Sequence, residues 1–449
     1  MLPPGTEAAP GGDGNGARAK TRYTFPTMLD LRLIRSDPQA VLVSLRRRDP
    51  TLDLGPLLAL DEERRALSQQ ADDLRHRQNE ASERIAALGR EGRQEERELL
   101  LTAMREVAAE RKGVEERLQV VERELETLLL ALPNIPHESV PAGTEDKVIL
   151  RTFGARPEFP FPPRHHVALA QDLGLLDLDR GAKVSGARFP MYIGDGARME
   201  FALLHWMIGF HVREHGYTPV LPPILANRAS FVTSGQFPKF ASEVYACPED
   251  GLFLNPTAEA LLVNLHRDET LAERDLPRRY VAYTPCFRRE AGTYGEEQRG
   301  LIRVHQFNKV ELFQYTTPET SYAALEEIVR QAETILQKLG LHYRVTLLPA
   351  GDLAHQAAKT VDVEVWLPGQ GRYYEVSSCS NCEDYQARRG NIRYRPADGG
   401  KPRFVHTLNG SALATSRLFA ALLEQNQRND GTVTLPPLLA DLLGKATLG

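Results

Sequence analysis

The chain has 449 residues, which is more than one hydrophobic core usually supports, so its length predicts two domains. Its formal net charge of −5 excludes nucleic-acid binding through an overall positive charge, so local arginines would have to hold any polyanion. Four cysteines are too few for a disulfide framework and indicate a reducing, cytoplasmic location. Because no apolar run of about 18 residues occurs, we expect no membrane span.

Residues 1–27 are rich in glycine, alanine and proline and contain no apolar segment like that of a signal peptide. This composition predicts a disordered tail or an incorrectly assigned start. Patterned sequence begins at Met28, which is the alternative initiator.

Apolar residues then recur every seven positions in two consecutive segments. The turn between the segments, 89–92, has a glycine at each end. This pattern predicts an antiparallel coiled-coil hairpin over about 57–131, within an N-terminal helical arm spanning 28–132. Each helix of about 32 residues would reach roughly 48 Å, so the hairpin should project from any globular body. The two series are Leu60, Leu67, Leu74, Ala81 and Leu88, followed by Leu100, Val107, Val114, Val121 and Leu128.

The charges on this hairpin do not by themselves identify a partner. Arginines such as Arg64, Arg75 and Arg84 stand among many glutamates, which is typical of a solvated face. On periodicity alone, a dimerisation helix or a spacer explains the heptads better than an RNA-binding arm.

Three prolines within 132–141 end the hairpin, because proline cannot continue a helix. We predict a linker over 133–147 and a second domain over 148–449. In this domain strand patterns alternate with amphipathic helices, which indicates an α+β fold built on a largely antiparallel sheet. The clearest strand patterns lie at 216–223, 281–284, 309–315 and 361–366, and a last helix is expected at 416–427.

Nucleotide chemistry is constrained by what the chain lacks. It has no Gly-x-x-x-x-Gly-Lys-Ser/Thr loop, so a P-loop is excluded. Fixed arginines and a Mg²⁺ ion on carboxylates must therefore hold the phosphates of any bound nucleotide. The candidates for the triphosphate are Arg288, Arg303 and Arg417, and those for the metal are Glu375 and Ser378.

Residues 284–312 predict two antiparallel strands joined by a glycine-rich, charged turn. Arg288, Glu290, Arg303 and Glu311 fall on the inner face, where an apolar strand has no need of charge unless something charged binds there. The run Phe287-Arg-Arg-Glu290 followed by Arg303-Val-His-Gln-Phe307 closely resembles motif 2 of class II aminoacyl-tRNA synthetases, in its seryl-tRNA synthetase form.

Further segments resemble the same family and keep its order along 28–440. Residues 196–223 are similar to motif 1, a helix and strand at the dimer interface. Residues 255–259 are similar to the serine-binding Thr-Ala-Glu loop, and 408–417 to motif 3, which closes on an arginine. The segment 377–389 completes the match.

The resemblance implies an ATP site. Arg288 is expected on the α-phosphate, Glu290 on the adenine amino group and Phe307 against the base. Arg417 is expected on the far phosphates, and Arg288 and Arg417 are the expected catalytic residues. The full set of expected ATP-binding residues is Arg288, Arg289, Glu290, Val304, Phe307, Glu375, Val376, Ser377, Ser378 and Arg417.

The resemblance also implies a serine site. A serine substrate presents an ammonium, which needs a carboxylate, and a hydroxyl, which needs a buried hydrogen-bond partner. Thr257 and Glu259 fit the first requirement, and Glu311 and Ser411 fit the second. The expected serine-binding residues are Thr257, Ala258, Glu259, Arg288, Glu311 and Ser411.

The implied reaction is activation of L-serine by ATP to seryl-adenylate, followed by transfer to tRNA(Ser), and to tRNA(Sec) where that tRNA occurs. Catalysis would rest on positioning and charge stabilisation, without a protein nucleophile. Mg²⁺ at Glu375 and Ser378 is the expected metal. The resemblance further implies a homodimer whose arm binds the tRNA, largely through its shape and backbone.

Two short patterns could be taken for zinc sites. His-x-x-Glu-His at 211–215 is common by chance, and Cys-x-x-Cys at 379–382 has no second pair of ligands at a suitable spacing. We expect no zinc at either.

Three alternatives remain open. The chain could be a paralogue with a resistance or biosynthetic role, a class II-like ligase that loads an amino acid onto a carrier protein, or a coiled-coil scaffold with an inactive catalytic domain. The long arm argues against the carrier ligase, and the complete set of charged residues against the scaffold. Departures from the family pattern at Ser234, Asn255, Ala412 and Ser416 lie near the substrate and spare the charged groups.

Overall fold

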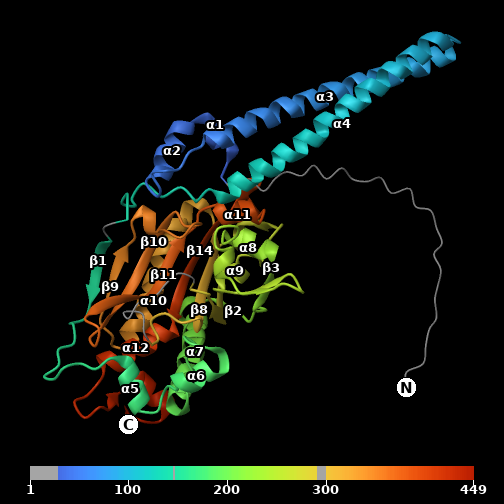
Figure 1. Cartoon of the computed structure of the whole chain (residues 1–449). Helices are drawn as coiled ribbons and strands as arrows, with labels where there is room; N and C mark the ends of the chain where they lie inside the picture. The colour runs from blue at the N-terminus through green and yellow to red at the C-terminus, as the bar shows by residue number, and fades with distance from the viewer. Residues whose placement is uncertain (1–28, 145–146, 291–299) are drawn as a thin grey trace, which may run out of the picture.

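Two long helices, α3 (Gly55–Arg90) and α4 (Gln94–Ala131), form an antiparallel hairpin that projects far beyond the rest of the chain (Figure 1). The computed structural model describes residues 29–144, 147–290 and 300–449. The predicted tail, the alternative start at Met28 and most of the charged turn after Glu290 lie outside the described residues. The predicted coiled-coil hairpin is confirmed.

The heptad residues form the contact between the two helices. Leu74, Ala81 and Leu88 of α3 are buried, as are Val107 and Val114 of α4. Two ion pairs cross from helix to helix, with nitrogen–oxygen distances of 2.7 Å for Arg117–Glu63 and 3.5 Å for Arg75–Glu115. Exposed pairs of this kind add little stability, so burial along the heptad positions holds the hairpin together.

The base of the arm has a small core of its own. Two short helices, α1 (Leu31–Ser36) and α2 (Pro38–Arg46), pack there against both long helices. Ile34 and Leu45 are fully buried beside Leu125 and Leu129 of α4, and Tyr385 of the second domain joins the same cluster. The arm is therefore anchored to the body by apolar packing as well as by the chain itself.

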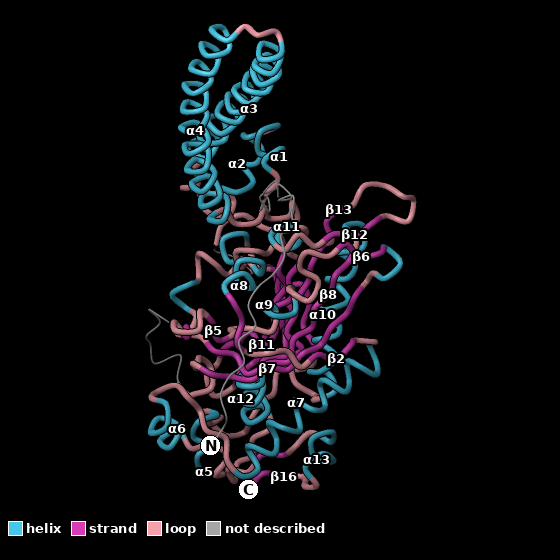
Figure 2. Tube along the Cα trace, turned by 90° about the vertical axis from the view of Figure 1, so that its right-hand side faces the viewer, coloured by secondary structure: helices cyan, strands magenta, loops and turns pink. Residues whose placement is uncertain are grey.

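The body is built on an eight-stranded sheet in the order β1-β9-β10-β11-β14-β8-β7-β2. Figure 2 shows strands of the body in magenta below the helical arm. Neighbouring strands are antiparallel except for β2 and β7, which run parallel. The predicted α+β fold with a largely antiparallel sheet is confirmed. In sheet order the strands are Val148–Phe153, Tyr343–Leu347, Lys359–Leu367, Arg372–Asn381, His406–Ala414, Gln306–Thr316, Arg278–Phe287 and Thr218–Val220.

Three helices pack against one face of this sheet: α7 (Gly194–His215), α10 (Ser321–Lys338) and α12 (Thr415–Gln425). They share one large hydrophobic cluster with Val310 and Leu312 of β8. Side chains alternate along a strand, so Lys309 and Glu311 point to the opposite face. The face of β8 that carries Lys309 and Glu311 is therefore not covered by these three helices and can contribute to a binding site.

The remaining helices and strands of the body are short. Short helices are α5 (His166–Asp172), α6 (Leu178–Ser185), α8 (Arg228–Ser234), α9 (Glu259–Leu262), α11 (Tyr385–Arg389) and α13 (Pro437–Leu443). Short strands are β3 (Leu225–Asn227), β4 (Ala246–Cys247), β5 (Leu252–Leu254), β6 (Thr270–Ala272), β12 (Arg393–Arg395), β13 (Arg403–Phe404), β15 (Val433–Thr434) and β16 (Thr447–Leu448). Single 3₁₀ turns occur at Ala241–Glu243, Glu273–Asp275, Pro318–Thr320 and Ala350–Asp352. Among the described helices, none has both the length and the apolar character to cross a bilayer.

Candidate active site

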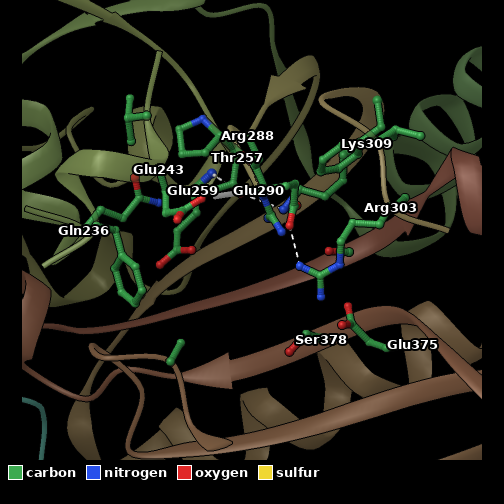
Figure 3. A pocket seen from close by; sticks show the side chains of 18 of the residues that line it. Gln236, Glu243, Thr257, Glu259, Arg288, Glu290, Arg303, Lys309, Glu375 and Ser378 are labelled. Carbon is green, nitrogen blue, oxygen red and sulfur yellow. Dashed lines mark hydrogen bonds and ion pairs between the residues drawn. The ribbon is translucent and has the colours of Figure 1, made fainter. Parts of the chain in front are cut away.

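A cavity of about 670 Å³ lies on the polar face of the sheet. Its walls come from β8, β11 and β14, from the first turn of α12, and from loops around 236–244, 256–259, 288–290, 302–304 and 354–356. Figure 3 shows Glu375 and Ser378 on one wall, with Arg303 across from them. Segments that are far apart in sequence therefore meet at one polar hollow.

Most of the predicted site residues line this cavity. They come from the serine loop, the β7–β8 hairpin, β11 and motif 3, as the resemblance implied. The predicted residues in the lining are Thr257, Glu259, Arg288, Glu290, Arg303, Val304, Phe307, Glu375, Ser378, Ser411 and Arg417.

Five predicted residues are not in the lining: Ala258, Arg289, Glu311, Val376 and Ser377. The Arg289 side chain donates from Nε to the carbonyl oxygen of Val244 at 3.1 Å, behind the cavity wall. Ser377 Oγ donates to the carbonyl oxygen of Ser411 at 2.6 Å. Side-chain contacts from these residues to a substrate therefore remain predictions.

At one end of the cavity, arginines lie close to an aromatic ring and a carboxylate. The guanidinium of Arg288 lies 5.2 Å from the centroid of the Phe307 ring, within range of a cation–π contact. Arg303 forms an ion pair with Glu290, visible as a dashed line in Figure 3. Glu290 itself has φ of 50°, in the left-handed region that non-glycine residues rarely adopt and that often marks functional sites.

Arg417 lies in the first turn of α12 and reaches across to β11. Its Nη1 donates to the carbonyl oxygen of Glu375 at 2.7 Å, and its Nε to that of Ile302 at 3.0 Å. The strand before it, β14, shifts register between Ser411 and Ala414, which is a β-bulge next to the cavity. The bulge interrupts the regular pairing of β14 with β8 just before α12, the helix from which Arg417 reaches Glu375.

Glu375 and Ser378 suit a hard divalent cation, since carboxylate and hydroxyl oxygens are ligands that Mg²⁺ accepts. Behind them, Asp362 of β10 pairs in register with Ser378 and accepts a hydrogen bond from its side chain. Burial, and secondarily the nearby Glu375 carboxylate, raise the pKa of Asp362 to about 7. One buried oxygen of Asp362 has no hydrogen-bond partner among the described groups. This donor set fits a cation.

At the other end of the cavity, three amides hold the buried carboxylate of Glu259. Gln356 and Gln386 donate from Nε2 to its Oε1 at 2.9 and 2.7 Å, and Asn409 donates from Nδ2 to its Oε2 at 3.4 Å. Burial raises the pKa of Glu259, and the neighbouring Glu311 carboxylate adds to this effect. A cation brought into the cavity would relieve both effects.

Glu311 lies behind the cavity surface and is fully buried. It forms an ion pair with Lys309, accepts from Thr257 Oγ1 at 3.5 Å and accepts from Asn409 Nδ2 at 3.3 Å. Lys309 also donates to Thr257 Oγ1 at 2.6 Å. Because β8 and β14 place Glu311 opposite Ser411, this end offers hydroxyl and amide partners beside two carboxylates.

Several lining residues were missed by sequence reasoning. Lys309 could have been found, because it stands two positions before Glu311 on the same face of a strand. Asn409 lies within the motif 3 segment. The loop residues carry no local pattern that reveals them. The missed residues are Gln236, Lys239, Phe240, Ser242, Glu243, Val244, Pro256, Ile302, Lys309, Ala354, Gln356, Ser380, Asn409 and Ala414.

The two patterns that resemble zinc sites lie in α7 and at the end of β11. His211 is buried within α7, with its Nδ1 at 2.9 Å from His215 Nδ1, and burial lowers its pKa to about 3. Cys379 and Cys382 are buried, reduced thiols on and just beyond β11.

Comparison with known families agrees with this geometry. Residues 28–136 match the seryl-tRNA synthetase N-terminal domain, and residues 244–426 match the tRNA synthetase class II core domain (G, H, P, S and T). The chain is 48% identical to the serine–tRNA ligase of Syntrophobacter fumaroxidans, covering 93% of this chain and 99% of that protein. It is 50% identical to that of Prosthecochloris aestuarii, covering 94% and 99%.

Two solved structures share the architecture. Seryl-tRNA synthetase from Pyrococcus horikoshii, complexed with ATP, is 39% identical with a TM-score of 0.88, covering 94% of this chain and 99% of that one. Cytoplasmic serine–tRNA ligase from Naegleria fowleri, in complex with AMP, is 28% identical with a TM-score of 0.80, covering 92% and 96%. The chain belongs to the seryl-tRNA synthetase family, within class II of the aminoacyl-tRNA synthetases.

Proposed function

We propose that the chain uses ATP to convert L-serine into seryl-adenylate and then transfers the seryl group to the 3′ end of tRNA(Ser). The observation that carries this proposal is the divided cavity. One end has arginines and an aromatic ring, and the other has the amide-held carboxylate of Glu259 beside Glu311. ATP and an amino acid with a hydroxyl side chain fit these two ends.

At the ATP end, Phe307 stacks on the adenine and Glu290 accepts from its amino group, while Val304 lines the pocket. Arg288 moves off the Phe307 ring onto the α-phosphate, where negative charge builds up as the serine carboxylate attacks phosphorus and diphosphate departs. Arg417 holds the far phosphates. The homologue from Pyrococcus horikoshii was solved with ATP, which supports a nucleotide in this cavity.

Glu375 and Ser378 would hold Mg²⁺, with Asp362 behind Ser378. The ion would neutralise phosphate charge and orient the departing diphosphate. Lys147 Nζ lies 3.5 Å from Asp362 Oδ2 and 2.8 Å from Glu364 Oε1. Its positive charge therefore compensates part of the negative charge beside the expected metal site.

At the serine end, Glu259 and Thr257 bind the ammonium group, and Arg288 reaches the carboxylate. Glu311 and Ser411 bind the hydroxyl. An amino acid without that hydroxyl would form no hydrogen bond with Glu311 or Ser411, so we expect alanine to be a poor substrate. In the second step the terminal ribose hydroxyl of the tRNA attacks the adenylate carbonyl and AMP leaves.

We further propose a homodimer in which the arm of one subunit holds the tRNA. The motif 1 segment exposes large apolar side chains, Phe201 on α7 at 70% and Leu221 after β2 at 86% exposure. Burial of these two side chains in a subunit interface would remove their apolar surface from water. Size-exclusion chromatography with light scattering tests this point, and a monomer at micromolar concentration would contradict it.

The activation step is tested by ATP–diphosphate exchange with purified chain and single amino acids. We expect exchange that depends on serine and on Mg²⁺, with little exchange on alanine. No exchange with any amino acid would contradict the proposal.

A further inference from the structure

Arg48 follows α2 at the base of the arm, and within the described part of the chain its side chain donates only to backbone carbonyl oxygens of other segments. Its Nη1 and Nη2 reach five of them at 2.7–3.5 Å. Burial lowers its pKa to about 10, so it stays charged at neutral pH. One carbonyl belongs to the linker and the rest to the segment 353–357. The acceptors are Asn134, Leu353, Ala354, His355 and Ala357.

Asn134, in the linker just after α4, binds the same segment from another side. It is almost fully buried. Its backbone N–H donates to the carbonyl oxygen of His355 at 2.8 Å, and its Nδ2 donates to those of Gln356 and Cys382, both at 2.9 Å. The segment 353–357 contains no helix or strand, so its position depends on contacts such as these.

The same segment forms part of the serine end of the cavity. Ala354 and Gln356 line it, and Gln356 donates from Nε2 to Glu259 Oε1 at 2.9 Å. The second amide on that oxygen, Gln386, belongs to α11, the short helix at the junction of arm and body (Figures 1 and 2). A neighbour on α11, Arg389, donates to the carbonyl oxygen of Leu130 in α4 at 3.1 Å.

We propose that the base of the arm is part of the serine site, and that Arg48 and Asn134 are positioning residues that fix Gln356 and, through it, the carboxylate of Glu259. This inference rests on the proposed function, because it assigns Glu259 to the substrate ammonium. Removing Arg48 frees the segment 353–357, and the Gln356 amide then no longer holds Glu259 in one orientation. The ionised form of Glu259 loses a donor and binds the ammonium more weakly.

Arg47 supplies a matched control, because it is the adjacent arginine and also donates only to backbone carbonyls. Its acceptors are in the linker, and none of them is in the segment 353–357. These acceptors are Pro136, His137, Glu138 and Val140. Arg47→Ala therefore removes an arm-base arginine without touching the support of Gln356.

The experiment compares Arg48→Ala with Arg47→Ala in serine-dependent ATP–diphosphate exchange, using the full chain. We expect Arg48→Ala to raise the KM for serine about tenfold or more and to change the KM for ATP less than twofold. Arg47→Ala should leave both constants within about twofold of wild type. Equal effects of the two variants, or a parallel rise of both constants in Arg48→Ala, would overturn the inference.

Asn134→Asp provides a second variant in case Arg48→Ala does not fold. It keeps the shape of the side chain but removes the donor to Gln356, and the same selective rise in the KM for serine is expected, with a Tm measured alongside. If Asn134→Asp folds and binds serine like wild type, the inference fails while the proposed function stands. A wild-type chain without serine-dependent exchange would instead overturn the proposed function itself.

Discussion

Lys309 and Glu311 form an ion pair on the same face of β8, and Glu311 is completely buried. Lys309 compensates the buried charge and also donates to Thr257 at 2.6 Å. The pair therefore links the stability of the sheet to the chemistry of the serine end.

Replacing Lys309 with methionine should lower both the stability of the fold and the activity with serine. Breaking one side of a buried pair costs about 3–5 kcal/mol, because the remaining charge has no partner. We expect a Tm lowered by several degrees and a kcat/KM for serine reduced at least about a hundredfold. The control is Lys112→Met, which breaks an exposed pair with Glu116 on the arm and should change neither value measurably.

The charge of Glu259 should set how serine binding depends on pH. Burial and Glu311 raise its pKa above the ordinary value of 4.5, and only the ionised form attracts an ammonium. As the pH falls from neutral toward that raised pKa, the KM for serine should rise, beginning above the range of an ordinary glutamate. Exchange assays between pH 5 and 8 measure this, and a serine KM that stays flat down to pH 5 would contradict the assignment.

Glu259→Gln provides the matching stability test. Because the folded-state pKa is raised, ionisation at neutral pH costs the folded chain stability, and that cost grows as the pH rises through the raised pKa. The variant should lose serine binding while keeping or raising the Tm at pH 7. A lowered Tm together with lost serine binding would point to a structural role for the carboxylate.

The arrangement of Arg417 cannot be reproduced by lysine. Its Nε and Nη1 bind the carbonyl oxygens of Ile302 and Glu375 at once, and a single ammonium cannot span both. Arg417→Lys should therefore lower kcat about tenfold or more and raise the KM for ATP, with the KM for serine nearly unchanged. Initial rates of exchange at varied ATP and serine separate these effects, and an unchanged KM for ATP would argue against a phosphate contact.

The Mg²⁺ assignment predicts a shifted metal requirement. Glu375→Gln removes a negative ligand and should raise the Mg²⁺ concentration for half-maximal exchange about tenfold or more. The titration is run at saturating ATP and serine. If this variant requires the same Mg²⁺ concentration as wild type, Glu375 is not a ligand of the ion.

The arm can be shortened without disturbing its base. Leu57, Leu125 and Leu129 pack with α1 and α2, whereas Ala71, Leu74, Val107 and Val114 form a separate cluster further out. Replacing residues 68–116 by a short glycine linker should leave serine-dependent exchange within about twofold and reduce tRNA charging at least about a hundredfold. Full charging by this variant would show that the outer arm does not hold the tRNA.

Local patterns account for much of what the sequence predicted. The heptads of α3 and α4 and the alternation along β7 and β8 depend on neighbours within a few positions, so periodicity reveals them. Arg288 and Glu290 were identified because charge beside an apolar strand pattern needs a reason, although both lie just after β7, and Arg417 was identified from the resemblance to motif 3.

The supports of the serine end could not be predicted in this way. Gln356 lies 97 positions from Glu259, and Asn134 lies 222 positions from Gln356. Arg48 binds backbone carbonyls 305–309 positions away. Carbonyl acceptors exist at every residue, so nothing in the sequence marks which of them a given arginine will reach.

Selection of serine in one cavity and its transfer to tRNA(Ser) can be measured in a single assay. The most direct measurement is charging of a tRNA(Ser) transcript by the full chain, with labelled serine compared with labelled alanine and threonine. We expect stable, Mg²⁺- and ATP-dependent charging with serine and at least about a thousandfold lower kcat/KM with alanine. Charging with alanine as efficiently as with serine, or serine-dependent exchange without any charging of tRNA(Ser), would contradict it.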